Sequence, residues 1–341
     1  MTTGPSAIGQ HRTPVTSNKR KIRIAVLDDY QEVALRYADW SALGADAEVT
    51  VFRDHLHDPD LVIERIGPFD VVCLMRERTP LSAGMLARLP HLKLIVTTAM
   101  WNASLDSDFA LQRGITVSGT TAVPSGTPEL AWMLILALAR RLPAELASMR
   151  NGGWQTSVGA DLEGRTLGIL GLGKIGTRLA KVANAFGMRV IAWSHNLTAE
   201  RAQNAGGRRV ERDELLRESD FISVNLKLSD RTRGLIGERE FGLMKPSAYF
   251  INTSRGPIVS EAALIDALRL KRIAGAGIDV FDIEPIAPDH PLRTMENVIA
   301  TPHIGYVTEA TYAHFFPQMV EDIRAWMDGA PIRLLPPQAH G

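Results

Sequence analysis

The segment Thr166-Leu-Gly-Ile-Leu-Gly-Leu-Gly-Lys-Ile-Gly176 constrains the fold of this chain more than any other feature. An apolar run typical of a buried strand ends in a G-x-G-x-x-G turn and continues into residues 177–186, which alternate apolar and polar at helical spacing. Gly187 ends that helical pattern, and residues 190–193 form the next apolar run. Strand, glycine turn, helix and strand together predict a βαβ unit.

Each glycine of this turn has its own geometric role. Gly171 permits the tight turn, Gly173 lets the backbone approach a phosphate, and Gly176 lets the helix pack close to the strand. A bare three-glycine pattern also occurs in simple βα turns, but the flanking strand and helix favour dinucleotide binding, with the pyrophosphate on the helix N-terminus. The predicted pyrophosphate site comprises Gly171, Gly173, Lys174, Ile175 and Gly176.

Composition limits the class of protein. At 341 residues the chain is long enough for two domains, and 45% hydrophobic with 22% charged residues is typical of a globular protein. The formal net charge is zero, which argues against nucleic acid or a membrane surface as partner. The single cysteine, Cys73, lies in an apolar run, so we expect a buried thiol, no internal disulfide and a cytoplasmic location. We assign no metal ligand.

Short apolar, β-branched runs alternate with helical patterns along the chain, which predicts α/β layers around parallel sheets. The first set of expected strands covers residues 22–27, 47–52, 70–75, 92–97 and 115–118, with helices at 81–88 and 107–113. The second set covers residues 167–170, 190–193, 221–225, 249–252, 275–280 and 298–301, which is the six strands of a dinucleotide-binding sheet.

These two sets predict two doubly wound parallel-sheet domains, the second a Rossmann domain inserted in the first. Residues 22–122 and 308–341 form the expected substrate domain, and residues 123–307 form the NAD(P)-binding domain. Residues 1–21 are polar, lack the apolar core of a signal peptide, and are expected to be a disordered extension. A final helix over 311–327 leads to a Pro-rich tail that returns to the first domain.

A long helix, Thr127 to Arg141, connects the two sets. Thr127 as N-cap, Pro128 at the first helical position and Glu129 in the first turn predict where it begins. The helix is apolar on nearly every side, so we expect it to be buried on every side, at a domain or subunit junction.

Polar residues that follow three strands of the second domain form a candidate active site. Ligands bind beyond the carboxyl ends of strands in such sheets, and Arg255, Glu284 and His303 come after the strands at 249–252, 275–280 and 298–301. Histidine can exchange the hydroxyl proton of a hydroxy acid, a carboxylate can orient the imidazole, and arginine can bind a carboxylate group. Taken singly, the three residues could be a capping arginine, a loop carboxylate and a turn histidine.

From about Ile22 to Asp328 the sequence resembles the D-isomer-specific 2-hydroxyacid dehydrogenases, relatives of which include phosphoglycerate dehydrogenase and the glyoxylate/hydroxypyruvate reductases. The matching motifs are Gly171-Leu-Gly-Lys-Ile-Gly176, Asn252-Thr-Ser-Arg-Gly256, Gly277-Ile-Asp-Val-Phe281 with Glu284-Pro285, and Thr301-Pro-His-Ile-Gly305.

The resemblance implies that Arg255 binds the substrate, that His303 is the acid/base and that Glu284 is its partner. It also implies that Asp279 contacts the nicotinamide end of the cofactor, that the two domains close over the substrate, and that the protein is a homodimer through the cofactor domain. The strand-end residues assigned to the cofactor are Thr253, Ser254, Arg255, Asp279, His303 and Gly305. Glu284 argues against formate dehydrogenase, and the short C-terminal remainder argues against a serine-sensing regulatory domain.

The chain departs from the family pattern at three places, one of which is Lys227, where a proline is usual near the adenine. The acidic residue that bonds the adenosine ribose in NAD enzymes is replaced by Ser194, followed by His195 and Asn196. Loss of that carboxylate leaves NAD and NADP both open and favours NADP slightly; as an alternative, His195 is an exposed turn residue.

The third departure concerns substrate binding in the first domain. In the segment 97–102, Ala99 and Trp101 stand where glycines are usual, and we assign substrate contacts to Arg76, Ala99, Met100 and Trp101. Trp101 could equally pack at the domain junction.

The sequence thus predicts an enzyme that transfers hydride between NAD(P)H and a small 2-keto or D-2-hydroxy acid. Two other functions stay open. One is a non-catalytic NAD(H)-sensing protein, similar to a corepressor, on the same fold. The other is hydride transfer to or from a different substrate class, such as phosphite.

Overall fold

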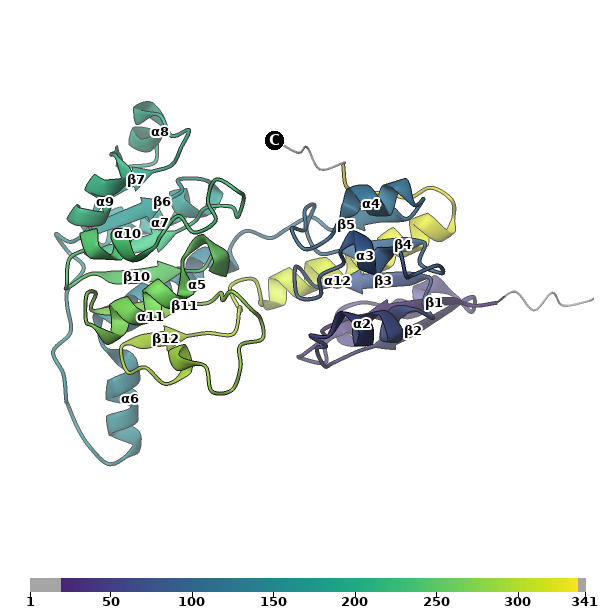
Figure 1. Ribbon diagram of the computed structural model, residues 1–341, viewed down its shortest axis with the longest axis horizontal. Helices are drawn as coiled ribbons and strands as arrows, with labels where there is room; N and C mark the ends of the chain where they lie inside the picture. Colours follow the sequence, from purple (N-terminus) through teal and green to yellow (C-terminus); the bar gives the residue numbers. More distant parts are fainter. Residues whose placement is uncertain (1–19, 337–341) are drawn as a thin grey trace, which may run out of the picture. The chain divides into compact units, whose positions relative to one another are not determined.

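The computed structural model describes residues 20–336, which divide into two compact units (Figure 1). The first unit contains residues 20–119 and 317–336, and the second is Thr120–Phe316. The border crosses the last helix, α12 (Glu309–Met327), between Phe316 and Pro317. The expected N-terminal extension, residues 1–21, lies outside the described residues except for its last two, as do residues 337–341 of the Pro-rich tail.

The first unit is built on a parallel sheet of five strands in the order β2-β1-β3-β4-β5. All four neighbouring pairs are parallel, as the alternating pattern predicted. The strands are β1 (Ile22–Val26), β2 (Ala47–Val51), β3 (Val71–Leu74), β4 (Leu94–Thr97) and β5 (Thr116–Gly119). The connecting helices are α1 (Ala34–Tyr37), η1 (Trp40–Leu43), α2 (Pro59–Ile66), α3 (Ala83–Leu86) and α4 (Ser107–Gln112).

Two features of the first unit refine the sequence interpretation. Helix α3 is shorter than the predicted 81–88, because Ser82 caps its start by accepting a hydrogen bond from the N–H of Met85. The C-terminal segment pairs with β5, where Leu335 N–H donates to the Val117 carbonyl at 2.9 Å. Cys73 is buried in β3, as its apolar neighbours predicted.

The second unit is built on a parallel sheet of seven strands in the order β12-β11-β10-β9-β6-β7-β8. Six of these are the predicted strands, and β8 (Arg208–Arg209) is additional. The others are β6 (Thr166–Leu170), β7 (Arg189–Trp193), β9 (Phe221–Val224), β10 (Tyr249–Asn252), β11 (Gly275–Ile278) and β12 (Val298–Ala300). The prediction of two parallel α/β domains is therefore confirmed.

Helices cover both faces of the seven-stranded sheet. Its strands are nearly continuous apolar runs, which is typical of parallel strands that are buried on both sides. One face packs against α5 (Gly126–Ala139), α7 (Lys174–Ala185) and α8 (Ala199–Asn204). The opposite face packs against α9 (Arg212–Glu218), α10 (Glu238–Leu243) and α11 (Glu261–Arg269). The remaining elements of this unit are α6 (Leu142–Arg150), η2 (Gly256–Ile258) and η3 (Pro291–Arg293).

Helix α5 corrects one expectation. It begins at Gly126 rather than after Thr127, and its N-cap, Ser125, makes no side-chain capping bond. Thr127 instead lies within the first turn, where its Oγ1 donates to the Gly305 carbonyl at 3.2 Å, because tertiary packing brings a strand-end loop over the helix start. Its own chain leaves one stripe of the helix uncovered, since Met133 is 46% and Leu136 is 37% exposed. Burial of this stripe at a subunit junction stays a prediction.

None of the helices within residues 20–336 has both the length and the apolar character needed to span a bilayer.

Candidate active site

The glycine turn adopts the geometry that its sequence predicted. Gly171 follows β6 with φ +98°, and a Cβ there would lie 2.6 Å from the Asn225 carbonyl oxygen. A Cβ at Gly176 would lie 2.3 Å from the Gly171 carbonyl oxygen. At Gly173, the N-cap of α7, a Cβ would meet nothing within 4 Å. Two glycines thus allow close packing, and the third leaves the backbone open beside the first N–H groups of a helix.

The strand ends that follow are in register. Asn252 of β10 pairs with Ile278 of β11, which pairs with Ala300 of β12. The residues after these strands, Thr253, Asp279 and Thr301, therefore emerge at one edge of the sheet. The loops that carry Arg255, Glu284 and His303 all start at this edge.

His303 and Glu284 form a pair at this edge. His303 Nδ1 lies 2.5 Å from Glu284 Oε2, and the other carboxylate oxygen accepts from the Phe281 N–H at 2.8 Å. Both side chains are partly exposed, 18% for His303 and 27% for Glu284. Because the carboxylate can only accept, Nδ1 carries a proton and Nε2 is the atom able to exchange one with a ligand. Among the described residues, no hydrogen bond uses Nε2.

Asp279 holds the loop that carries His303. Its carboxylate is buried and accepts hydrogen bonds from Thr301 Oγ1 at 2.6 Å, from Ile304 N–H at 2.8 Å and from Gly305 N–H at 2.9 Å. Burial raises the pKa of Asp279, an effect that these hydrogen bonds and the nearby His303 oppose. His303 itself has φ +51°. The hydrogen bonds from the loop to Asp279 stabilise this unfavourable backbone conformation.

Arg255 is presented by a turn that Asn252 shapes. The Asn252 side chain accepts from the Ser254 N–H at 3.0 Å and donates to the Arg255 carbonyl at 3.1 Å. Arg255 donates from its guanidinium to the Ser254 carbonyl at 2.7 Å. Asn252 is a positioning residue that sequence reasoning placed in the motif without assigning it a role.

The Arg255 turn packs directly against the loop of Glu284. A Cβ on Gly256 would lie 2.1 Å from the carbonyl oxygen of Phe281, the residue whose N–H donates to Glu284. The two backbones touch at this point, which only glycine allows. The structure thus connects the loops of Arg255, Glu284 and His303 into one constellation.

Two buried polar atoms at the same edge fit a bound nicotinamide dinucleotide. Asn225 Oδ1 and Thr253 Oγ1 have no hydrogen-bond partner within residues 20–336. A buried polar atom without a partner costs stability unless a ligand or water satisfies it. Together with the open backbone at Gly173, these atoms suit a cofactor that lies along the ends of β6, β9 and β10.

The predicted adenosine-binding residues lie after β7. Ser194 is half-buried, whereas His195 and Asn196 are exposed. The His195 ring lies edge-on to Trp193, with centroids 4.8 Å apart. Strand β8 brings Arg209 beside this turn, a neighbour that sequence reasoning missed because a two-residue strand has no periodic pattern to detect.

The predicted substrate residues of the first unit lie together at the carboxyl end of its sheet. Arg76 follows β3 with φ +54°, and its N–H donates to Thr98 Oγ1 at 2.7 Å. Ala99 has φ +69°, and the two residues after it, Met100 and Trp101, are 38% and 39% exposed. The usual glycine at position 99 is thus replaced by a residue held in a conformation that glycine favours.

The same edge of the first unit contains a network that sequence reasoning missed. Buried Asp28, with φ +59°, receives hydrogen bonds from His55 Nδ1 at 2.9 Å and from Thr79 Oγ1 at 2.7 Å. Its carbonyl accepts from the guanidinium of Arg78 at 2.7 Å. These residues are far apart in sequence, and no local motif connects them.

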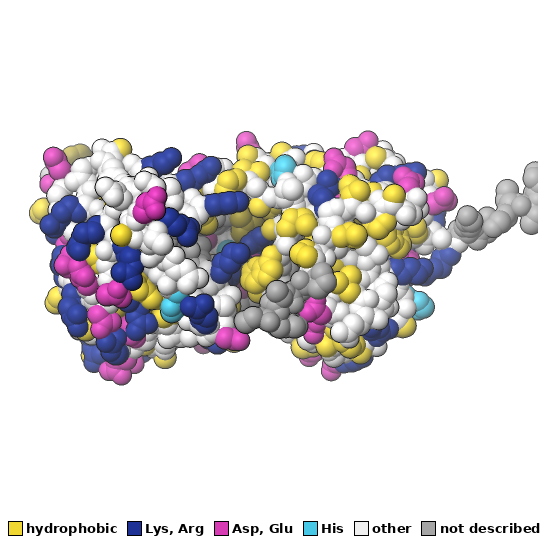
Figure 2. Space-filling view, turned by 90° about the horizontal axis from the view of Figure 1, so that it is seen from above, with side chains coloured by type: hydrophobic (Ala, Val, Ile, Leu, Met, Phe, Trp, Pro, Cys, Tyr) yellow, Lys and Arg dark blue, Asp and Glu magenta, His cyan; other side chains and the backbone are white. Residues whose placement is uncertain are grey.

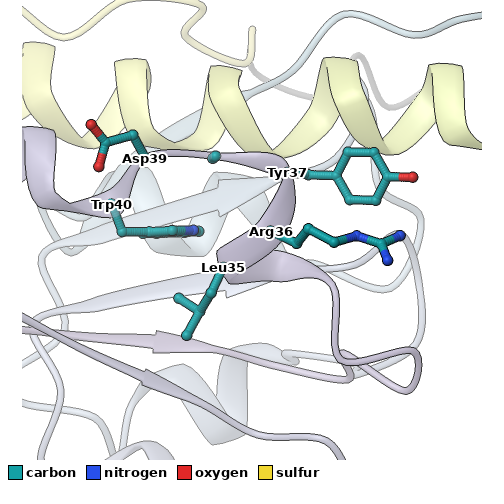
Figure 3. Close-up of a pocket in the computed structure, with 6 residues that line it drawn as sticks. Leu35, Arg36, Tyr37, Asp39 and Trp40 are labelled. Atoms are coloured by element: carbon teal, nitrogen blue, oxygen red, sulfur yellow. The ribbon is translucent and has the colours of Figure 1, made fainter.

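A pocket of about 470 Å³ in the first unit contains none of the predicted site residues. Leu35, Arg36, Tyr37, Asp39 and Trp40 line it along one continuous chain segment, and Figure 3 shows that their side chains point in different directions. Because its polar groups do not converge, we assign it no ligand.

Comparisons with known proteins identify the family of this chain. A family model described as D-isomer specific 2-hydroxyacid dehydrogenase, NAD binding domain, matches residues 132–305. Glyoxylate reductase from Aeropyrum pernix is 39% identical over 255 residues, which cover 72% of this chain and 76% of that protein. Hydroxypyruvate reductase from Blautia hydrogenotrophica is 30% identical, covering 92% of this chain and 99% of that protein.

A solved structure also matches the whole architecture. Phosphoglycerate oxidoreductase from Vibrio cholerae o395 gives a TM-score of 0.85 at 36% identity, covering 91% of this chain and 100% of the other. Both the family and the fold class predicted from the sequence are thereby confirmed.

Proposed function

Because the chain belongs to the D-isomer-specific 2-hydroxyacid dehydrogenases, we propose that it transfers hydride between a nicotinamide dinucleotide and a small 2-keto or D-2-hydroxy acid through His303, Glu284 and Arg255. The observation that carries this assignment is the 2.5 Å contact between His303 Nδ1 and Glu284 Oε2, on loops of a sheet whose first turn fits a pyrophosphate.

His303 is the proton carrier in this proposal. During reduction, Nε2 gives its proton to the substrate carbonyl oxygen, which becomes the hydroxyl; during oxidation, Nε2 takes the hydroxyl proton. When bound, the nicotinamide supplies the carbon that gives or accepts the hydride. Glu284 fixes the orientation of the imidazole and stabilises its charged form.

Arg255 binds the substrate carboxylate. Its guanidinium presents donors in a rigid fork that matches a carboxylate, and the turn stabilised by Asn252 limits where that fork can point. From the first unit, Arg76, Ala99, Met100 and Trp101 contribute further substrate contacts in this proposal. The exposed apolar surfaces of Met100 and Trp101 support a role in reading the substrate side chain.

Residues 123–307 form the cofactor domain in this proposal, and residues 22–122 with 308–341 form the substrate domain. Gly171, Gly173, Lys174, Ile175 and Gly176 would hold the pyrophosphate of the cofactor. The adenosine end would lie on Ser194, His195 and Asn196, and the nicotinamide end would contact Thr253, Ser254, Arg255, Asp279, His303 and Gly305. The absence of a carboxylate at Ser194 favours NADP over NAD.

The enzyme would act as a homodimer through its cofactor domain. Exposed apolar side chains on α5, on α6 and after it support this assembly: Met133, Leu136, Leu142, Leu146, Met149, Trp154 and Val158. Large exposed apolar patches are typical of protein interfaces. Replacing Met133 and Leu146 with Glu should halve the mass measured by analytical ultracentrifugation, whereas an unchanged mass would contradict the assignment.

A cytoplasmic location is supported by the lone cysteine. Cys73 is buried in β3, and burial raises the pKa of its thiol, so it is neither a disulfide partner within the chain nor a reactive thiolate.

A spectrophotometric screen of 2-keto acids with NADH and with NADPH tests the function directly. We expect oxidation of at least one dinucleotide in the presence of glyoxylate, hydroxypyruvate or a related acid. Loss of that activity in Arg255→Ala and His303→Ala, with an unchanged circular dichroism spectrum, would tie it to the site. Tight cofactor binding without turnover across the panel would instead favour the NAD(H)-sensing alternative.

A further inference from the structure

Strand β8 and the start of α9 each place one arginine near the turn expected to bind adenosine: Arg209 and Arg212. β7 and β8 are parallel, with Ile191 opposite Arg208 and Ala192 opposite Arg209. The Val210 N–H continues this ladder by donating to the Ala192 carbonyl at 3.0 Å. Since the register advances equally in both strands, the residues that follow β8 emerge next to those that follow β7.

The Arg209 side chain lies against this turn. Its Nε donates to the Leu197 carbonyl at 3.0 Å, and another guanidinium nitrogen lies 2.9 Å from Glu211 Oε1. The Arg209 side chain is 38% exposed, so part of the guanidinium faces solvent. Leu197 closes the turn of Ser194, His195 and Asn196, since its N–H donates to the Ser194 carbonyl at 3.1 Å, so the bond places this positive charge at that turn.

Arg212 approaches the same turn from the start of α9. Its guanidinium carbon is 5.9 Å from the centre of the Trp193 ring, the ring that His195 contacts edge-on. Arg212 also lies 3.3 Å from Glu240 Oε1, a carboxylate that it shares with Arg239. Figure 2 shows the second unit from the side of α8 and α9, with Lys and Arg side chains interspersed among acidic ones.

We propose that Arg209 and Arg212, with Ser194, bind the 2′-phosphate of NADP(H) and make this enzyme prefer it over NAD(H). The inference rests on the proposed function and names the residues that select its cofactor. A 2′-phosphate carries between about one and a half and two negative charges at pH 7, and a guanidinium fork matches its oxygens. A 2′-hydroxyl offers neither the charge nor that geometry, so the two arginines discriminate between the dinucleotides.

Glu211 is the competing group at this position. Its side chain is 70% exposed and follows β8. In NAD enzymes an acidic residue at the position of Ser194 accepts hydrogen bonds from the ribose hydroxyls, and the Glu211 carboxylate is able to do the same. Its ion pair with Arg209 offsets that charge in the present arrangement. If Arg209 faces the ribose, the site prefers NADP(H). If Glu211 faces it, the site prefers NAD(H), and Arg209→Ala and Glu211→Gln distinguish the two cases.

The test is a calorimetric titration of the full chain with four probes: NADPH, NADH, adenosine 2′,5′-bisphosphate and AMP. We expect NADPH and the bisphosphate to bind at least about tenfold more tightly than NADH and AMP. Arg209→Ala and Arg212→Ala should each weaken NADPH binding by about 10- to 100-fold and change NADH binding by less than about twofold. Ser194→Asp adds a negative charge beside the expected phosphate and should weaken NADPH binding by a similar factor.

Arg217→Ala is the matched control. Arg217 lies on α9, is 58% exposed and pairs with Asp213 at 3.9 Å, so its removal changes the net charge equally but leaves the turn intact. It should leave the ratio of the NADPH and NADH dissociation constants unchanged.

Three results would overturn the inference: tighter binding of NADH than of NADPH, equal losses for both dinucleotides in the arginine variants, or a weakening confined to NADH in Glu211→Gln. Each leaves the dehydrogenase assignment intact if NADH still binds and is turned over. Failure of both dinucleotides to bind would instead overturn the proposed function and the inference with it.

Discussion

The two parallel sheets of this protein share an architecture but end in edges of opposite character. At the edge of the first, both carboxylate oxygens of buried Asp28 are satisfied by His55 and Thr79. At the edge of the second, Asn225 Oδ1 and Thr253 Oγ1 are buried without a partner among residues 20–336. A closed network stiffens its loops, whereas buried polar atoms that lack a protein partner are left for a ligand or water to satisfy. The edge with these two unpartnered oxygens is the one that we propose to bind the cofactor.

The backbones of the two edges differ as well. The first has non-glycine residues at positive φ, Asp28, Arg76 and Ala99, each of which costs about 1–3 kcal/mol. The second has glycine at the tight turn, Gly171, and one non-glycine residue at positive φ, His303, in the pair proposed to be catalytic. The first edge therefore depends on its hydrogen-bond network to maintain the loops that carry the proposed substrate contacts.

The largest effect should follow from His303→Ala, which tests whether the second edge is the chemical one. Loss of a general acid/base lowers kcat by about 10²- to 10⁴-fold, measured as NAD(P)H oxidation with the best keto acid. The matched control is His290→Ala, because His290 Nε2 pairs with Glu261 at 3.0 Å and is similarly buried. Equal losses in both variants would contradict a special role for the His303–Glu284 pair.

A second prediction places a pH-dependent group in the first unit. Burial raises the pKa of Asp322 to about 7, against the opposing effect of Arg333, which lies 2.9 Å away. The folded protein therefore keeps a proton that the unfolded chain loses above about pH 4, so this group makes stability fall as pH rises from about 4 to about 7. The fall amounts to at most about 4 kcal/mol.

Asp322→Asn should remove that dependence. Denaturant unfolding at a series of pH values between about 4 and 8 measures it. Stability that rises through this window in the wild type, or an unchanged slope in the variant, would contradict the assignment.

The third prediction tests whether the Asp28 network is structural. Asp28→Asn keeps the size and the positive φ, which asparagine tolerates, but its amide cannot accept from both His55 and Thr79. We expect a loss of about 1–3 kcal/mol in the free energy of unfolding and unchanged affinity for the dinucleotide. Asp54→Asn, at an exposed carboxylate paired with Arg65, is the control and should cost less than about 1 kcal/mol.

The fourth prediction separates the glycines of the second edge. Because a Cβ at Gly173 meets nothing within 4 Å, Gly173→Ala should leave the melting temperature unchanged. It should nevertheless weaken dinucleotide binding by about tenfold, or about 1.4 kcal/mol, since the methyl group occupies the phosphate approach. Gly242→Ala, also with open space, is the control. Unchanged affinity in Gly173→Ala would move the pyrophosphate away from this turn.

The smallest effect should come from Ala99→Gly. Relief of a positive φ gains about 1–2 kcal/mol, whereas the greater flexibility of glycine in the unfolded chain costs about 0.5–1 kcal/mol. We therefore expect a net stabilisation of about 0.5 kcal/mol, measured by denaturant unfolding. A clear destabilisation would mean that the methyl group of Ala99 packs against something the loop needs.

Local sequence determined much of this protein. The glycine turn after β6, the predicted strands and the order of polar groups at their ends could all be predicted, because each depends on residues a few positions apart. The pairing of Glu284 with His303 could be anticipated for a related reason: both follow neighbouring strands, and parallel strands end at a common edge.

Tertiary structure decided what depends on distant segments. Thr127 reads as an N-cap, yet it lies inside α5 because the Gly305 loop supplies its partner. Arg209 meets the turn after β7, and Arg212 the ring of Trp193, only because two residues of β8 pair with β7. Asp28 meets His55 and Thr79 only across three strand ends. Such contacts produce no local pattern in the sequence, because they join residues that only folding brings together.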